Sequence, residues 1–78
     1  MPTILEMDFG RIKVVIYFKD HDPPHVHAIA PGCEARFAIE SLELLSSSGF
    51  TRTAIGKIRR YLGANQWALI EAWNVYKD

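Results

Sequence analysis

Apolar and polar residues alternate with a period of two along the first part of the chain. One alternating run covers residues 3–8 and a second covers residues 12–18, with Phe9-Gly10 between them. Alternation of this kind is typical of β-strands that bury one face, so the sequence predicts two strands joined by a turn. Pairing that places Glu6 opposite Lys13 brings opposite charges together on the outer face and keeps apolar side chains inside.

A second hairpin is predicted around Pro31-Gly32, a pair that suits the central positions of a type II turn. Its strands would cover residues 25–30 and 33–39. Symmetrical pairing about the turn places Arg36 directly opposite His27. The core face would then carry Val26, Ala28, Ala30, Cys33, Ala35, Phe37 and Ile39, and the other face His25, His27, Ile29, Glu34, Arg36 and Ala38.

The period becomes helical after about residue 51. A connection containing Leu42, Leu44 and Leu45 leads to the break Ser-Ser-Ser-Gly at residues 46–49, and Thr51 can cap the first helix. Gly63 would end or bend this helix, and Asn65 can cap a second one. The helical stripes are Ile55, Ile58 and Leu62, then Gln66, Leu69, Ile70, Trp73 and Tyr76, and we expect Trp67, Trp73 and Tyr76 in the core.

These elements predict an α+β fold, with a four-stranded antiparallel sheet followed by two C-terminal helices packed on one face. A chain of 78 residues makes a single domain, residues 1–78. Cys33 is the only cysteine, which excludes an internal disulfide, and no N-terminal apolar run or membrane-length segment is present. We therefore expect a cytoplasmic protein that does not enter a membrane; a homo-oligomer stays possible.

The formal net charge is zero, so no global field draws the chain to nucleic acid or lipid. The charges are nevertheless unevenly distributed. No acidic residue lies between Glu43 and Glu71, and this interval contains Arg52, Lys57, Arg59 and Arg60. The segment is either a solvated helix face or a surface for an anionic partner.

All three histidines lie in the stretch DHDPPHVH, residues 20–27. The two prolines lack a backbone donor and favour extended geometry before them, so they lead stiffly into the strand that begins at His25. His25 and His27 would project from the same face, with Cα atoms about 6 to 7 Å apart. We expect this pair on the side of the sheet that the helices leave uncovered.

Three interpretations of the histidine pair stay open, and the first is a metal site. Two imidazoles at this separation can converge on zinc or another divalent metal, but such a site needs a further ligand. Arg36 opposite His27 would repel a cation in the predicted register. The nearby candidates for that ligand are His21, Asp20, Asp22 and Glu34.

The second interpretation is catalysis. His25 and His27 could move protons at neutral pH, with Arg36 and Tyr17 beside them for an anionic substrate. No nucleophile or phosphate loop accompanies them, and Cys33 is predicted to face inward. The third interpretation is structural: half-buried rings bonded to Asp20, Asp22 or backbone carbonyls would hold the Pro-Pro loop.

The chain also resembles a family of short bacterial proteins, domain of unknown function four-one-six-zero. The resemblance rests on the opening Met-Pro-Thr-Ile, the stretch at residues 20–27, Glu-Ala-Arg-Phe at residues 34–37 and the closing Ala-Trp at residues 72–73. Members carry the Pro-Pro-His-x-His positions and usually a basic residue at the place of Arg36. An aromatic residue is common where this chain has Ala38, so a stacking platform is not expected there.

The resemblance implies no established activity. Members are often encoded beside another small protein, an arrangement similar to toxin-antitoxin pairs, which implies a small protein partner. We therefore expect a binding module that engages a protein partner or nucleic acid, and keep a small metal-assisted or histidine-based hydrolase, nuclease-like, as the alternative. The expected binding residues are His25, His27, Arg36, Arg11, Lys13, Arg59 and Arg60; the catalytic candidates are His25, His27, Arg36 and Tyr17; the metal candidates are His21, His25 and His27.

Overall fold

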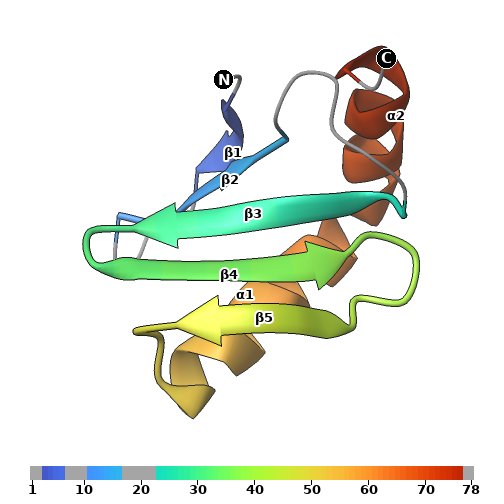
Figure 1. Cartoon of the computed structure of the whole chain (residues 1–78). Coiled ribbons are helices and arrows are strands. Elements are labelled where there is room, and N and C mark those ends of the chain that lie inside the picture. Colours follow the sequence, from blue (N-terminus) through green and yellow to red (C-terminus); the bar gives the residue numbers. More distant parts are fainter. Residues whose placement is uncertain (1–2, 7–10, 17–22, 77–78) are drawn as a thin grey trace.

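A computed structural model of the chain describes residues 3–6, 11–16 and 23–76. The described residues form five strands and two helices, labelled in Figure 1. These are β1 (Thr3–Glu6), β2 (Lys13–Val15), β3 (His25–Ala30), β4 (Cys33–Ala38), β5 (Leu44–Ser48), α1 (Arg52–Ala64) and α2 (Gln66–Tyr76).

The strands form one antiparallel sheet in the order β1-β2-β3-β4-β5, so every strand pairs with its neighbour in the sequence. Hairpins alone can produce this order, because no connection has to cross the sheet. The predicted α+β class, an antiparallel sheet followed by two helices, is confirmed. The sheet also contains β5, which the sequence had presented as a connection and a break.

The strand β5 was missed because its sequence, Leu-Leu-Ser-Ser-Ser, has no apolar alternation. It is an edge strand whose last four side chains are all exposed, so backbone pairing with β4 holds it rather than a buried face. Gly49 then turns the chain away with a φ of 89°. A Cβ at this position would lie 2.5 Å from the carbonyl oxygen of Gly32, so a larger residue does not fit.

The register of both hairpins agrees with the sequence where the structure describes it. Glu6 lies opposite Lys13, and His27 lies opposite Arg36. Gly32 has a φ of 73°, as the third residue of a type II turn requires. The first turn, predicted at residues 9–10, lies outside the described residues. The register between β2 and β3, which the sequence did not fix, places Val15 opposite His27.

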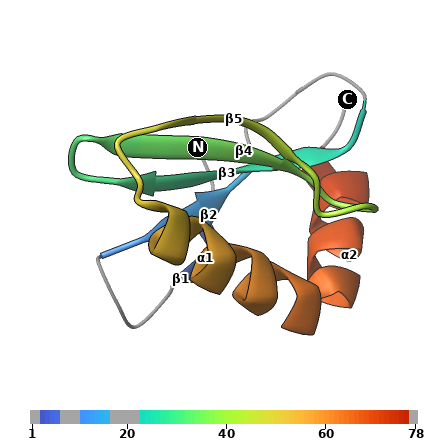
Figure 2. The ribbon, with the colours of Figure 1, turned by 90° about the horizontal axis from the view of Figure 1, so that it is seen from below.

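Both helices lie on the same side of the sheet, as Figure 2 shows. In that view α1 runs beneath the strands, and α2 stands at the end where β3 begins. The predicted inner face of β3 and β4 supplies the sheet side of the core, and the helices supply the stripes expected of them. The buried cluster comprises Ile12, Val14, Ile16, Val26, Ala28, Ala35, Phe37, Ile39, Ile55, Ile58, Leu62, Leu69 and Trp73.

Polar residues set the ends of the helices. The Thr51 hydroxyl accepts a hydrogen bond from the amide of Ala54 at 3.1 Å and so caps α1, as predicted. The helix continues through Gly63 to Ala64, and Asn65 is its C-cap: the backbone N–H of Asn65 donates to the carbonyl of Leu62 at 3.1 Å. Gln66 then fixes the start of α2, because its amide donates to two carbonyls of the β4–β5 connection, at 2.7 Å and 2.9 Å.

The aromatic residues of α2 divide between core and surface. Trp73 is buried, at 3% exposure, as the helical spacing predicted. The same prediction is wrong for Trp67, which is 74% exposed. Trp67 precedes the buried Leu69 by two positions, which places it on nearly the opposite face of α2. The side chain of Tyr76, also predicted in the core, lies outside the description.

Candidate functional site

The imidazoles of His25 and His27 lie together on one face of β3, as the period of the strand predicted. Their ring centroids are 5.2 Å apart and the ring planes meet at 62°. Neighbouring residues Val26 and Ala28 point into the core shared with the helices. The histidine rings therefore belong to the opposite side of the sheet.

This side is not open at the histidine pair, which corrects the sequence-based expectation. Each residue is only 8% exposed. The Trp73 ring lies 5.6 Å from the His25 ring, because α2 stands against the end of the sheet where β3 begins (Figure 1). Val15 of β2, itself 2% exposed, lies directly opposite His27 of β3, so the two side chains are on the same face of the sheet. The pair is thus part of the packed interior at this end.

Each histidine is oriented through its Nδ1 atom. Nδ1 of His25 lies 2.8 Å from the carbonyl oxygen of Pro23. A carbonyl can only accept, so Nδ1 of His25 carries the proton. Nδ1 of His27 lies 3.2 Å from Oε2 of Glu34, and it donates to that carboxylate in the same way. The neutral form of both rings then has its lone pair on Nε2, the arrangement that metal-ligating and proton-transferring histidines commonly have.

The predicted neighbour Arg36 does not provide the charged contact of this pair. It lies opposite His27 in the register, but its Nε donates to the hydroxyl of Ser46 on β5 at 3.0 Å. Glu34 contacts His27 instead, although its side chain is 52% exposed. The position of the backbone was therefore predictable, whereas the direction of the long side chain was not.

The described part of the chain adds no third metal ligand to the histidine pair. Residues 3–6, 11–16 and 23–76 contain no group of three or more His, Cys, Asp and Glu side chains placed to hold an ion. His21 and Tyr17, named for these two roles, lie outside the described residues. Cys33 is a free, half-buried thiol on the hairpin next to Ala30.

The predicted binding cations are distributed over separate places. Arg11 and Lys13 line a hollow of about 370 Å³ together with residues 29–31. Arg59 is held against the fold: its Nε donates to the carbonyl of Leu42 at 3.1 Å, and its guanidinium carbon lies 5.8 Å from the centre of the Phe37 ring. Lys13 lies opposite Ile29 and therefore shares the sheet face of the histidine pair, as predicted, whereas Arg59 lies on α1, on the helix side of the sheet.

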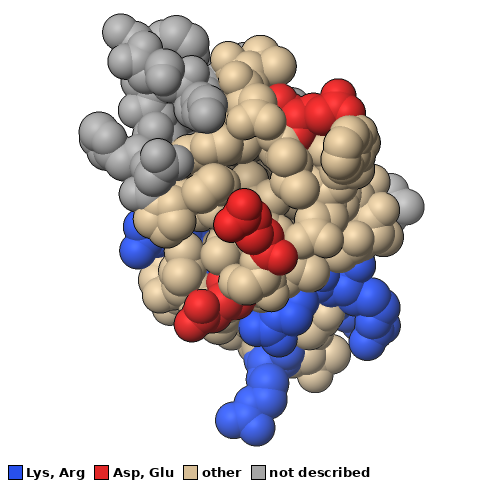
Figure 3. Space-filling view, turned by 90° about the vertical axis from the view of Figure 1, so that its right-hand side faces the viewer, with Lys and Arg blue, Asp and Glu red and all other residues tan. Residues whose placement is uncertain are grey.

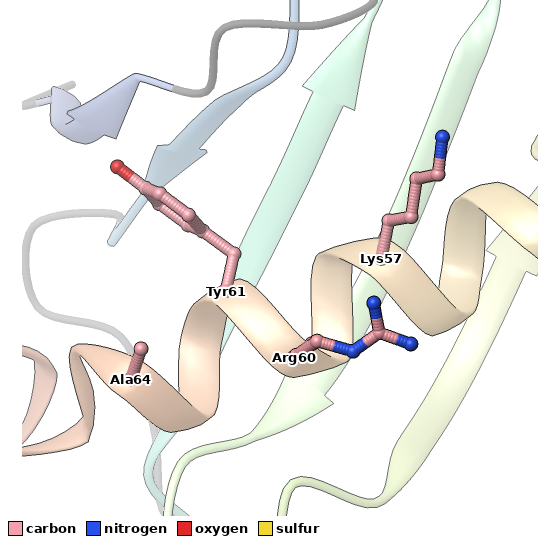
Figure 4. Close-up of a pocket in the computed structure, with 4 residues that line it drawn as sticks. All are labelled: Lys57, Arg60, Tyr61 and Ala64. Atoms are coloured by element: carbon pink, nitrogen blue, oxygen red, sulfur yellow. The ribbon is translucent and has the colours of Figure 1, made fainter.

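Arg60 lies in a second hollow, which we call the α1 hollow. Its volume is about 360 Å³, and its lining includes Lys57, Arg60, Tyr61 and Ala64, drawn in Figure 4. All four come from α1 at relative positions 0, 3, 4 and 7, a spacing that places them on one helix face. From the sequence, Lys57 was predicted only as one of the basic residues of this segment and was not connected with Tyr61 and Ala64. The signal that could have done so is this spacing.

Charge is unevenly distributed on the surface. On the side drawn in Figure 3, most of the visible Lys and Arg side chains lie in the lower part and a smaller group lies at the left edge, with Asp and Glu side chains above and beside the lower group. All four basic residues of α1 are exposed, and the helix contains no acidic residue. Within the described residues, no helix has the length and apolar character needed to cross a membrane.

Comparison with known proteins assigns the family and no activity. The comparison with curated proteins gives no match, and neither does the comparison with solved structures. A family model, described as domain of unknown function (DUF4160), matches residues 12–74. This range extends from the start of β2 into α2 and includes the histidine pair and the α1 hollow. The chain therefore belongs to the family DUF4160.

Proposed function

We propose that the protein is a nucleic-acid-binding module and that α1 provides its contact surface. The observation that carries this proposal is the concentration of charge: in a chain whose formal net charge is zero, two exposed cations, Lys57 and Arg60, lie on one face of a helix that contains no acidic residue. Positive charge gathered on one helix attracts phosphates locally even when the whole molecule is neutral. The α1 hollow adds a place where a ligand group can sit between cations.

The histidine pair has a supporting role in this proposal. Because His25 and His27 are nearly buried and are oriented by Pro23 and Glu34, they fix the end of β3 against α2 rather than contact a polyanion. This differs from the binding surface expected from the sequence, in which the two imidazoles were the centre. The contact surface moves from the sheet to the first helix.

The test is a salt titration of binding to a short fluorescent RNA oligonucleotide, followed by anisotropy. For binding through phosphate contacts, the logarithm of the binding constant falls linearly with the logarithm of the salt concentration. The slope is about 0.7 for each contact to a single strand. Lys57→Glu should weaken binding strongly and flatten the slope. Arg52→Glu is the matched control, because it makes the same charge change on the same helix outside the lining of the α1 hollow.

Two outcomes contradict this proposal. One is the absence of RNA or DNA binding at low ionic strength. The other is an equal loss of affinity in Lys57→Glu and Arg52→Glu, which would indicate long-range attraction without a contact surface on the hollow side of α1.

The proposal also includes a small protein partner. Members of the family that the chain resembles are often encoded beside another small protein, as toxin-antitoxin pairs are. Its support is that arrangement and not a feature of the fold. Co-purification of the chain from its own cell at native expression level tests it. A stoichiometric small protein supports a two-protein system, and recovery of the chain with nucleic acid alone removes that part of the proposal.

Histidine-based hydrolysis is the second candidate, because one specific observation favours it. Both Nδ1 atoms are held by oxygen acceptors, which leaves Nε2 as the basic nitrogen of each neutral ring. We would test it by measuring the metal content of untagged protein and its hydrolysis of RNA. Stoichiometric zinc that is lost in His25→Gln would favour the hydrolase over the binding module; a metal-free protein without RNA cleavage would remove this candidate.

A further inference from the structure

The geometry of the α1 hollow points to a more specific ligand, on the assumption that the proposed function is correct. We infer that the hollow takes one unpaired base of a single-stranded nucleic acid, which stacks on the Tyr61 ring while Lys57 and Arg60 contact the flanking phosphates. Single-strand binders commonly combine an aromatic stacking surface with cations that follow the backbone.

The arrangement on α1 separates the ring from the charges as such a ligand requires. In Figure 4 the Tyr61 ring extends to one side of the labelled residues, and the charged ends of Lys57 and Arg60 lie toward the other. Lys57 and Tyr61 are four residues apart, so they are neighbours on the helix face. Ala64, one turn further on, has a small side chain and leaves room beside the ring.

The side of α1 that forms the hollow lies away from the core. The buried residues of the helix, Ile55, Ile58 and Leu62, occupy another face. Tyr61 lies at the boundary: it packs against the core cluster with part of its side chain and remains partly exposed with the rest. A ring supported from behind in this way loses little conformational freedom when a base stacks against its exposed part.

The α1 hollow is a shallow depression that is largely open to solvent. A flat base can therefore lie against the Tyr61 ring while the strand continues over the helix surface on either side. Because bases in a duplex are already stacked on their neighbours, only an unpaired base can present its face to Tyr61.

Two other partners fit the cations without using the ring. Duplex DNA or RNA would contact Lys57 and Arg60 through phosphates alone, and an acidic protein segment would pair with them through carboxylates. The presence of Tyr61 between these cations and Ala64 is what favours the single strand. The experiment therefore has to separate the contribution of the ring from that of the charges.

The experiment compares the affinity of the full chain for an RNA oligonucleotide, single-stranded and as a duplex of the same sequence, at one salt concentration. We expect tighter binding of the single strand. Tyr61→Leu keeps apolar volume without a ring and should weaken single-strand binding by about 5- to 100-fold, with duplex binding unchanged. Tyr61→Phe, the matched control, should retain the preference because it retains the ring.

Each result decides the inference separately from the proposed function. If Tyr61→Leu binds both RNAs as the unaltered protein does while Lys57→Glu weakens both, the stacking inference is overturned and nucleic-acid binding remains. Tighter binding of an acidic peptide than of RNA overturns the inference, and no RNA binding at all overturns both. If Tyr61→Leu does not fold, the unaltered protein still decides: equal affinity for single strand and duplex contradicts a site for an unpaired base.

Discussion

Two imidazoles on the same strand are held by acceptors of different kinds. His25 donates to the backbone carbonyl of Pro23, whose position is set by the stiff Pro-Pro entry into β3. His27 donates to the carboxylate of Glu34, a side chain that is 52% exposed. An exposed charged partner contributes little to stability, because water competes for it. For His27 the packing of the ring therefore contributes more than its hydrogen bond.

This difference can be measured with single substitutions. We expect His25→Ala to lower the free energy of unfolding by about 2 to 4 kcal/mol, because it removes a buried ring that packs beside Trp73 and His27. Glu34→Ala should cost less than about 1 kcal/mol. Urea unfolding followed by tryptophan fluorescence gives both values. A His25→Ala protein as stable as the unaltered chain would show that the pair is not a packing element.

A second residue-scale prediction concerns glycine. Gly49 has a φ of 89°, and a Cβ there would meet the Gly32 carbonyl, whereas Gly56 within α1 has open space around it. Gly49→Ala should therefore destabilise the fold by about 1 to 3 kcal/mol. Gly56→Ala should stabilise it by about 0.5 to 1 kcal/mol, since alanine is the better helix former. Thermal unfolding of the two variants should shift in opposite directions, and a shift in the same direction contradicts the argument.

At the scale of elements, short-range signals fixed most of the fold. The type II turn at Pro31-Gly32 set the register that places Arg36 opposite His27, and Thr51 marked the start of α1. Features that depend on distant segments were not predictable in this way. The exposure of the histidine pair depends on where α2 packs, and β5 depends on pairing with β4 because its own serines carry no alternation.

The Thr51 cap should contribute measurably to the stability of α1. Thr51→Ala removes the acceptor for the Ala54 amide and should cost about 0.5 to 2 kcal/mol. Thr53→Ala is the control, because Thr53 is an exposed residue of the first turn and alanine favours helix more than threonine does. Denaturation midpoints followed by circular dichroism should fall for the first variant only. If both fall equally, the loss comes from the threonine side chains in general and not from the cap.

For the whole molecule, the fold separates Arg59 from the two other basic residues in the middle of α1, Lys57 and Arg60. Arg59 faces the sheet, where it contacts the Leu42 carbonyl and the ring of the fully buried Phe37. Lys57 and Arg60 line the α1 hollow on another face of the helix. The sequence predicted a basic segment and named Arg59 and Arg60 together as binding residues. It could not separate them, because their roles depend on which side of α1 the sheet covers.

Substitutions of the two adjacent arginines should separate an effect on stability from an effect on RNA binding. Arg59→Ala should lower the free energy of unfolding by about 0.5 to 1.5 kcal/mol, since it removes the link from α1 to the β4–β5 connection, and should leave the salt dependence of RNA binding unchanged. Arg60→Ala should change stability by less than about 0.5 kcal/mol and reduce the salt slope by about one phosphate contact. Chemical denaturation and salt titration on the same two proteins give the four values. An equal reduction of the slope in both variants would place Arg59 in the contact surface and contradict the division of α1 into a structural and a binding side.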